Sequence, residues 1–557
     1  MHVVYRESHG LEETESPFDL GQTPADLVVM SFSDSDLGAF AAGWQRGRAS
    51  LPTLRLANLV ALRHPLSVDT YVEQTLIGAK GILIRLIGGE SYWPYGLMQV
   101  QDLARRHAIA LAVLPADGRE DARLDALSTL PVSTLRRLSA LCDAGGAVAA
   151  EAALAQLALA AGLYAGPVLG DKTVPDCGWY DPARGVVAGP DGPGPFVAGT
   201  FYRSYLTSAD TASVDGLIEA FRARGLNAIG LFAPSLKAPG AGEFLRASLA
   251  VLDPVAIVNA TAFSAKGAGG ETPLDGPGCP VFQVALSTAR RKDWVAAERG
   301  LSPADLAMHV VLPEVDGRIF AGVASFKSPT KRDPDLQFSR FAHRADAGLI
   351  AAVVDRVAGW VSLAATAVQD VKLAVILSTY PGKSHQLAHA VGLDALASTE
   401  ASLDRLAGAG YSVSSGSDLG HALGEATISW PLTAYLAALD TIPDILRQDL
   451  LAVWGAPDAD PDCRDGALHF KALRRGLALV ALQPERGDVL RRDDDYHDLS
   501  RTPRHAYVAF YLWLRAQGCQ TLVHVGAHGT LEWLPGKAVA LSADCWPDAL
   551  LVSVPVI

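Results

Sequence analysis

The sequence predicts an α/β protein built from several parallel-sheet domains with a helical insert. Short apolar runs typical of buried strands alternate with amphipathic runs typical of helices. The alternation resumes near Phe196, after the Gly-, Pro- and Asp-rich stretch 181–195. The chain has 557 residues, of which 49% are hydrophobic and 19% charged. This composition supports a large core and excludes global disorder, and the length allows about three or four domains.

Strands and helices alternate along residues 1–115, the predicted N-terminal α/β domain. Four apolar runs are predicted strands, at 26–30, 51–56, 81–87 and 109–114. The segments between them are predicted helices, at 34–44, 67–77 and 93–107. Ser33 or Asp34 can cap the first of these helices, and Ser67 can cap the second.

Three further regions follow. Residues 116–195 are predicted as a helical insert and linker, because 119–165 has a helical period and 181–195 is a loop. Residues 196–370 form the second α/β domain, with a helix at 214–224, strands at 228–232 and 256–260, and a Gly-rich loop at 266–278. Residues 371–557 form the third, which opens with a strand at 371–377 and carries the His/Glu motif described below.

The chain ends in a strand-like apolar run, residues 550–557, with no polar tail. This predicts a third domain truncated at its C-terminus, so that the chain is part of a longer protein. The alternative is a C-terminal strand docked on the sheet.

Charge and cysteine content exclude several classes of function. The chain has 47 Lys plus Arg against 60 Asp plus Glu, a net charge of −13, and no long basic run, which argues against a nucleic-acid partner. The N-terminus lacks a signal-peptide core, and no segment is predicted to span a membrane. The six cysteines form no CxxC pair, which argues against a zinc ribbon or an iron–sulfur cluster. A cytoplasmic, reduced protein is therefore predicted.

The densest group of chemically active side chains is the stretch Leu522-Val-His-Val-Gly-Ala-His-Gly-Thr-Leu-Glu-Trp-Leu-Pro-Gly-Lys537. An apolar run brings His524 to a strand end, and two glycines permit turns that could bring His528 and Glu532 near it. Two imidazoles and a carboxylate at four-residue spacing could bind a divalent metal or transfer protons. The pattern is not the HExxH motif of metalloproteases. The alternative is that His528 and Glu532 only stabilise a turn through hydrogen bonds.

Two segments resemble phosphate loops and fail the pattern. In the first, 378–384, Leu377 stands where the phosphate-loop pattern needs its first glycine. The four residues before Gly382 contain a proline and no glycine. In 535–538, Ala538 replaces the hydroxyl that would bind magnesium. No nucleotide site is predicted.

Three other segments are explained by ordinary structure. The acidic run 493–498 is predicted as a solvated loop. Residues 504–514, preceded by Pro503, are predicted as a helix with His505 at its start and core aromatic residues. Asp316 and Gly317 have the chemistry of a turn.

Phrases across nearly the whole chain resemble the large subunits of aerobic cobaltochelatases, a family related to the porphyrin-binding large subunits of magnesium chelatases. The His524–Lys537 stretch is the most specific of them, and the opening phrases favour the cobalt branch. The other phrases are Asp34–Asp36, Arg55–Asp69, Gly88–Tyr95, Phe201–Arg203, Leu312–Arg318, Tyr496–Asp498 and Pro503–Tyr507.

The resemblance implies ATP-dependent insertion of Co²⁺ into hydrogenobyrinic acid a,c-diamide during cobalamin synthesis. It implies two partner subunits that use ATP and Mg²⁺, one of them an AAA+ ATPase. The family's chains are far longer, so this chain resembles their N-terminal portion. Two alternatives stay open: a magnesium chelatase large subunit that acts on protoporphyrin IX, and a non-catalytic tetrapyrrole carrier or sensor.

With this resemblance, the His/Glu stretch is predicted to be the insertion site, beside a hollow large enough for the macrocycle. His524, His528 and Glu532 are the expected transient ligands of Co²⁺, and Glu532 and His528 the expected catalytic pair. The corrinoid substrate carries acidic side chains. The expected substrate-binding residues are Arg203, Arg504, His505 and Trp533, the two arginines acting by bidentate pairing.

Overall fold

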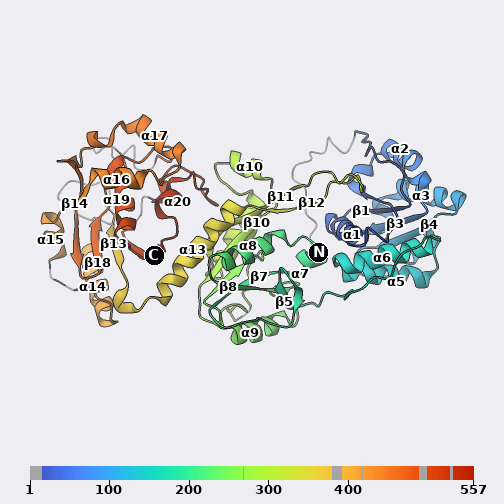
Figure 1. Ribbon diagram of the computed structural model, residues 1–557, viewed down its shortest axis with the longest axis horizontal. Helices are drawn as coiled ribbons and strands as arrows, with labels where there is room; N and C mark the ends of the chain where they lie inside the picture. Colours follow the sequence, from blue (N-terminus) through green and yellow to red (C-terminus); the bar gives the residue numbers. More distant parts are fainter. Residues whose placement is uncertain are drawn as a thin grey trace. The chain divides into compact units, whose positions relative to one another are not determined.

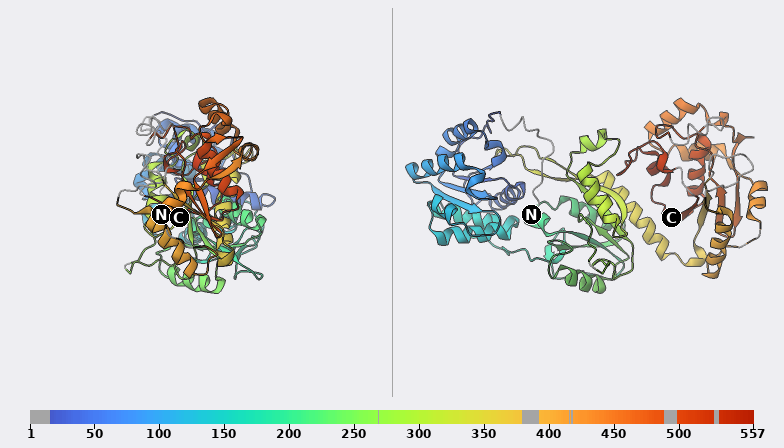
Figure 2. Two further views of the ribbon diagram at one scale, coloured as in Figure 1. Left: turned by 90° about the vertical axis from the view of Figure 1, so that its left-hand side faces the viewer. Right: turned by 180° about the vertical axis from the view of Figure 1, so that it is seen from behind.

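The computed structural model describes residues 16–267, 269–378, 392–414, 416, 418–487, 498–526 and 531–557. The chain forms two compact units, each shown from three sides in Figure 1 and Figure 2. Unit 1 contains residues 1–291, 308–318 and 324–346, and unit 2 contains residues 292–307, 319–323 and 347–557. The α/β class with several parallel sheets is confirmed.

The first sheet of unit 1 has four parallel strands in the order β2-β1-β3-β4. Almost every residue in these strands is buried, because helices cover both faces of the sheet. They match the four predicted strands, and their bounds are β1 (Leu27–Ser31), β2 (Leu54–Asn58), β3 (Gly81–Leu86) and β4 (Ala110–Pro115).

Two helices pack on one face of this sheet, α2 (Pro65–Gln74) and α3 (Pro94–His107). The other face is covered by α1 (Asp34–Gly47), α5 (Val132–Ala144) and α6 (Gly146–Ala160), and α4 (Ala122–Leu127) follows β4. The predicted helical insert is therefore a layer of the first sheet. A close approach explains this: a Cβ on Gly43 of α1 would lie 2.6 Å from the backbone nitrogen of Glu151 in α6.

Of the two predicted N-terminal helix caps, the structure confirms one and contradicts the other. The Ser33 hydroxyl accepts a hydrogen bond from the Asp36 backbone N–H at 3.2 Å, as predicted. Ser67 lies inside α2, which begins at Pro65 and is capped by the His64 ring. Proline at the first helical position moves the start of the helix, since its fixed φ suits that position.

The second sheet of unit 1 has eight strands in the order β12-β11-β10-β9-β7-β8-β5-β6. Its centre is parallel, and its edges are antiparallel. The predicted loop 181–195 is partly wrong, because its start completes a hairpin in which Trp179 pairs with Val187. The strands are β5 (Gly178–Asp181), β6 (Gly185–Val187), β7 (Phe196–Tyr202), β8 (Asn227–Ala233), β9 (Ala256–Asn259), β10 (Val281–Ser287), β11 (Ile319–Pro329) and β12 (Phe341–Ala345).

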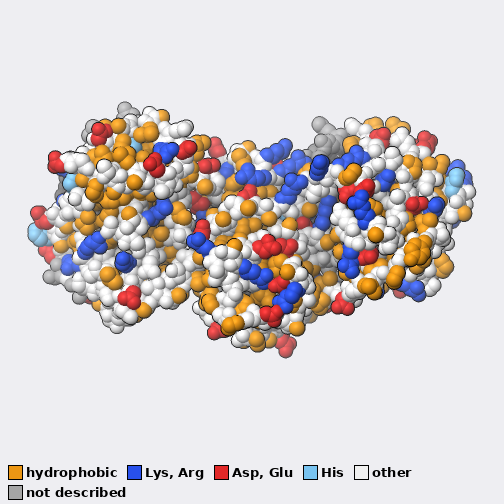
Figure 3. All heavy atoms as spheres, viewed as in Figure 1, with side chains coloured by type: hydrophobic (Ala, Val, Ile, Leu, Met, Phe, Trp, Pro, Cys, Tyr) orange, Lys and Arg blue, Asp and Glu red, His pale blue; other side chains and the backbone are white. Residues whose placement is uncertain are grey.

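Helix α9 (Ala241–Leu252) packs on one face of the second sheet, and α8 (Ala212–Ala223) covers the other. The short helices are α7 (Arg203–Thr207), α10 (Arg291–Ala296), α11 (Pro303–Leu306) and α12 (Leu312–Glu314). Asp316 does more than form the predicted turn: its buried carboxylate pairs with Arg318 at 2.6 Å. On the face drawn in Figure 3, acidic and basic side chains are interspersed over unit 1.

Unit 2 is built on a four-stranded sheet in the order β17-β18-β13-β19. Strands β13 (Leu373–Leu377), β18 (Ala478–Leu482) and β19 (Thr521–Val525) are parallel, and β17 (Ala472–Arg475) is antiparallel. A smaller antiparallel sheet consists of β14 (Ile428–Pro431), β15 (Cys463–Arg464) and β16 (Ala467–Phe470).

Helix α19 (His505–Ala516) lies on one face of the main sheet, and ten of its residues are buried. It matches the predicted helix at 504–514. The helices α16 (Leu432–Leu439), α17 (Asp444–Trp454) and α20 (Trp546–Leu551) pack around it, and α14 (Ala395–Gly408) and α15 (Leu419–Glu425) cover the opposite face.

The strand predicted at 550–557 is mostly wrong. Its start belongs to α20, whose Leu550 is buried in the core. Only the last three residues run along β19, where the Ile557 N–H donates to the Leu522 carbonyl and the His524 N–H donates to the Ile557 carbonyl, both at 2.9 Å. Pro547 in the first turn of α20 favours a helix there.

Helix α13 (Ala347–Ala365) is the one described helix that is long and apolar enough to cross a membrane, with a mean hydropathy of 1.5. No such segment was predicted. Asp355 and Arg356 lie near the middle of α13, and Arg356 forms an ion pair with Asp548 of α20. A spanning helix would have to bury these charges in lipid, so the ion pair favours packing within unit 2.

Candidate functional site

Three parallel strands of unit 2 end side by side in polar residues. Gln483 follows β18, Ser378 follows β13, and His524 is the fourth residue of β19. The Gln483 N–H donates to the Leu377 carbonyl at 3.0 Å, and the Ser378 N–H donates to the Val525 carbonyl at 3.2 Å. Ligands in parallel α/β sheets bind outside the carboxyl ends of the strands. This edge is therefore the candidate functional site.

His524 lies opposite Ile376 in the strand register. Its ring stacks on Tyr511 of α19, with 6.3 Å between centroids and 9° between planes. Burial lowers the pKa of His524 to about 4, because the charged imidazolium loses its hydration. The buried Nε2 atom has no hydrogen-bond partner among the described residues. The sheet edge therefore holds a neutral imidazole with one nitrogen left for a ligand.

We expect His524 to stay neutral down to about pH 5. NMR of the chain with ¹³C-labelled histidine would measure this, and the His524→Phe variant would identify the His524 resonance. The folded chain then binds fewer protons than the unfolded chain between about pH 4 and pH 6.5. The contribution of His524 to stability is present above pH 6.5 and is lost as the pH falls toward 4. A His524 resonance that titrates above pH 6 would contradict this environment.

A layer of hydroxyl groups lies beside His524. The Gln483 amide donates to the Tyr511 hydroxyl at 2.6 Å and to the Tyr507 hydroxyl at 3.2 Å. The pKa of Tyr511 is well above its usual value, mainly because of burial, and the nearby charge of Glu532 contributes to the shift. The phenol therefore stays protonated and can donate a hydrogen bond at neutral pH.

Glu532 and Trp533 lie in a short helical turn, Leu531–Trp533, and the Glu532 side chain is exposed. The Trp533 carbonyl accepts a hydrogen bond from the Arg486 guanidinium. Lys537, just beyond, donates to the carbonyls of Val295 and Ala297, both at 2.9 Å. The segment that follows Glu532 is thus held within unit 2, while the carboxylate faces solvent.

The structure also shows a residue that the sequence analysis did not select. The Ser378 hydroxyl is buried and has no hydrogen-bond partner among the described residues. The sequence signal for Ser378 is the change from the apolar run 371–377 to a hydroxyl residue, at the start of the segment that resembles a phosphate loop. The same signal marks Gln483, which follows the buried strand β18.

Arg504 and His505, two predicted substrate-binding residues, are engaged inside the protein. The Arg504 guanidinium pairs with Asp460 at 2.9 Å and with Asp462, and donates to the Glu485 carbonyl at 2.9 Å. The two ring nitrogens of His505 contact the Tyr435 hydroxyl at 2.8 Å and the Gly455 carbonyl at 3.0 Å. A substrate contact by either side chain would require one of these interactions to break.

Arg203 is placed in unit 1, at the start of α7, and donates to the carbonyls of Val174 and Pro175. His528, the acidic residues 493–497 and most of 378–384 lie outside the described residues. Among the described residues, no group of three or more His, Cys, Asp or Glu side chains is arranged to hold a metal ion. Of the predicted metal ligands, the structure thus describes His524 and Glu532, both near Tyr511.

Comparison with known proteins covers most of the chain. Residues 152–557 match the family described as CobN/Magnesium Chelatase. The aerobic cobaltochelatase subunit CobN of a Sinorhizobium species is 34% identical over 100% of this chain and 46% of its own length. The CobN of Pseudomonas aeruginosa is 36% identical with the same coverage. A magnesium-chelatase protein of Rhodobacter capsulatus, the H component of that enzyme, is 27% identical over 63% of this chain and 32% of its own length.

A solved structure shares the fold. The catalytic subunit of cobaltochelatase from Mycobacterium tuberculosis has a TM-score of 0.75 and 28% identity, and the match covers 95% of this chain and 45% of that one. The chain therefore spans about half the length of the curated relatives it matches.

Proposed function

Because the chain belongs to the CobN/magnesium chelatase family, we propose that it is the tetrapyrrole-binding part of a cobaltochelatase large subunit. The proposed reaction inserts Co²⁺ into hydrogenobyrinic acid a,c-diamide on the route to cobalamin. Two partner subunits, one of them an AAA+ ATPase, would hydrolyse ATP with Mg²⁺. The cobalt relatives match the whole chain at higher identity than the magnesium relative, which favours cobalt. All six cysteines are free thiols, which agrees with a cytoplasmic site.

The observation that carries the proposal is the neutral His524 ring, whose buried Nε2 has no hydrogen-bond partner in the part of the chain that the structure describes. A metal ion binds only the deprotonated ring nitrogen, so a low pKa removes the competition from protons at neutral pH. Imidazole is a suitable ligand for Co²⁺. The same low pKa makes His524 a weak base. We therefore assign His524 as a transient Co²⁺ ligand rather than a proton acceptor.

Metal insertion also requires a proton acceptor. As the four ring nitrogens bind cobalt, the corrin ring loses its inner N–H proton and Co²⁺ gives up bound water. The exposed Glu532 carboxylate can accept a proton and pass it to solvent. Arg486 holds the carbonyl of the next residue, Trp533, and Lys537 anchors the segment beyond it, which limits how far the carboxylate moves. His528 would share this role, and Trp533 would contact the macrocycle.

Quenching of intrinsic tryptophan fluorescence tests the substrate. We expect the chain to bind hydrogenobyrinic acid a,c-diamide at least about tenfold more tightly than protoporphyrin IX, equivalent to about 1.4 kcal/mol. Bovine serum albumin, titrated in parallel, controls for non-specific tetrapyrrole binding. If protoporphyrin IX bound more tightly, we would assign the chain to a magnesium chelatase instead. Binding without cobalt insertion, when the complete large subunit and both partners are present, would make the protein a carrier or sensor.

A further inference from the structure

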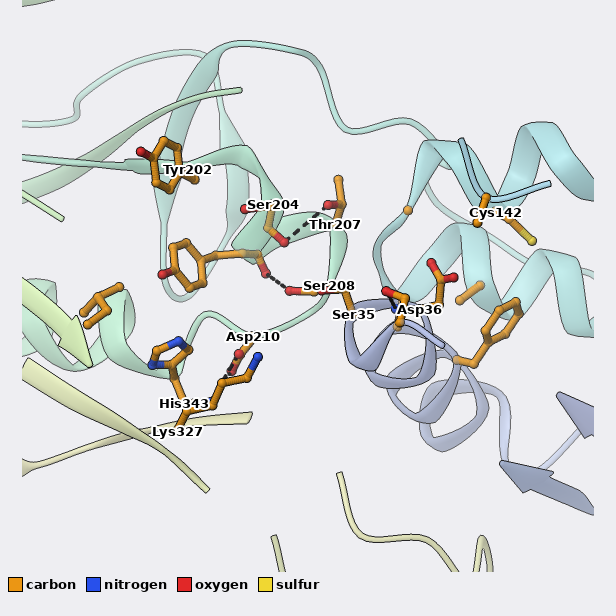
Figure 4. A pocket seen from close by; sticks show the side chains of 18 of the residues that line it. Ser35, Asp36, Cys142, Tyr202, Ser204, Thr207, Ser208, Asp210, Lys327 and His343 are labelled. Carbon is orange, nitrogen blue, oxygen red and sulfur yellow. Dashed lines mark hydrogen bonds between the residues drawn. The ribbon is translucent and has the colours of Figure 1, made fainter. Parts of the chain in front are cut away.

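A cavity of about 540 Å³ lies inside unit 1, and all of its lining residues belong to that unit. This volume is within the range of about 300–1,000 Å³ that is typical of small-molecule sites. None of the residues assigned above to metal insertion lines it. Figure 4 shows the side chains of part of its lining.

The cavity receives the carboxyl ends of strands from both sheets of unit 1. From the first sheet, Ser33 follows β1, and Arg85 and Ile87 bracket the end of β3. From the second sheet, Tyr202 ends β7, and Thr288 follows β10. The carboxyl edge of a parallel α/β sheet is where ligands bind in such folds. Two edges of this kind share one cavity, an arrangement that indicates a binding site.

One wall contains a buried cation with a donor that has no partner among the described residues. The Arg85 guanidinium is 4% exposed and pairs with Asp36 at 2.9 Å and with Asp143 at 2.6 Å. Its Nε–H is buried without a hydrogen-bond partner among the described residues. A buried donor left without a partner is destabilising, because it has lost its hydrogen bond to water. An acceptor on a bound molecule would remove that cost.

The opposite wall is formed by Asp210, His343 and Lys327, grouped together in Figure 4. Both Asp210 oxygens accept the His343 backbone N–H, at 3.1 and 3.2 Å. The His343 ring contacts the Ser325 hydroxyl at 3.1 Å and meets Tyr205 edge-on at 5.7 Å. Burial and the charge of Lys327 lower the pKa of His343 to about 3, so this imidazole is a neutral hydrogen-bonding group.

The charges around the cavity argue against an anionic ligand. Three lining carboxylates, of Asp36, Asp143 and Asp210, accompany two lining cations, Arg85 and Lys327. A further negative charge would add to this excess. Hydroxyl groups are abundant, on Ser33, Ser35, Ser204, Thr207, Ser208 and Thr288. We propose that the cavity binds a small polar molecule that carries several hydrogen-bonding groups and no net charge.

Ligand-observed NMR on the intact chain tests this proposal with matched probes. The net-uncharged probes are adenosine, benzamide and phenylalanine, and their anionic counterparts are AMP, benzoate and phenylpyruvate. Ser35→Trp and Ser204→Trp each place an indole in the cavity from an exposed position on opposite walls. Ser402→Trp, at an exposed position on α14 of unit 2, is the control.

We expect at least one uncharged probe to give a saturation-transfer signal that falls at least threefold in each cavity variant and is unchanged in Ser402→Trp. Its anionic counterpart should give the weaker signal. The proposal is overturned if no uncharged probe responds to either cavity variant, or if the anions bind the cavity more tightly. Because the two variants lie on different elements, misfolding of one leaves the other informative. The outcome does not depend on cobalt insertion.

Discussion

Replacing His524 with phenylalanine should lower kcat/KM for Co²⁺ about 100-fold in the complete large subunit assayed with its partner subunits. Phenylalanine keeps the ring that stacks on Tyr511 and removes the nitrogen that we assign to the metal. A 100-fold loss corresponds to about 2.7 kcal/mol of transition-state stabilisation, an amount that one metal–ligand contact can supply. The KM for Co²⁺ should rise, and the affinity for the tetrapyrrole should change little.

The comparison with Glu532 separates a metal ligand from a proton acceptor. Glu532→Gln should lower kcat by about 100-fold or more while the KM for Co²⁺ changes less, since a general base contributes about 10²–10⁴. His421→Phe and Glu425→Gln, at exposed positions of α15, are matched controls and should insert cobalt normally. Normal turnover of folded His524→Phe and Glu532→Gln variants would refute the site assignment.

The second large effect is on stability. Arg504→Met should lower the free energy of unfolding by about 3–5 kcal/mol, because it leaves Asp460 as a buried, uncompensated charge. Asp460 also accepts a hydrogen bond from the Ala506 N–H at 3.0 Å, so the destabilisation would extend to the first turn of α19. Urea unfolding of the intact chain, followed by circular dichroism, measures the change.

Arg447→Met is the matched control for this prediction. Arg447 pairs with Asp440 and Asp444, whose side chains are both 76% exposed, and exposed pairs contribute about 0–1 kcal/mol. We expect Arg447→Met to unfold like the unchanged chain. If Arg504→Met is equally stable but binds the corrinoid poorly, Arg504 is a substrate-binding residue, as the sequence analysis expected, and the stability argument fails.

Local patterns in the sequence were sufficient for the strands of the first sheet and for helix α19. A buried strand or an apolar helix is encoded within about five to fifteen neighbouring residues, so its position can be predicted without the rest of the chain. The exceptions are also local: Pro65 moves the start of α2, and Pro547, in the first turn of α20, favours a helix where a strand was predicted. The family resemblance, and the presence of His524 and Glu532 in one stretch, were likewise available from the sequence alone.

Only the tertiary structure decided which polar groups meet. Ser378 and His524 are neighbours because β13 lies between β18 and β19, an order that joins segments far apart in the chain. The burial of Arg504 depends on Asp460 and Asp462, and the cavity of unit 1 depends on two separate sheets. Local periodicity carries no information about such pairings, because hydrogen bonds, desolvation and charge act between groups brought together by the fold.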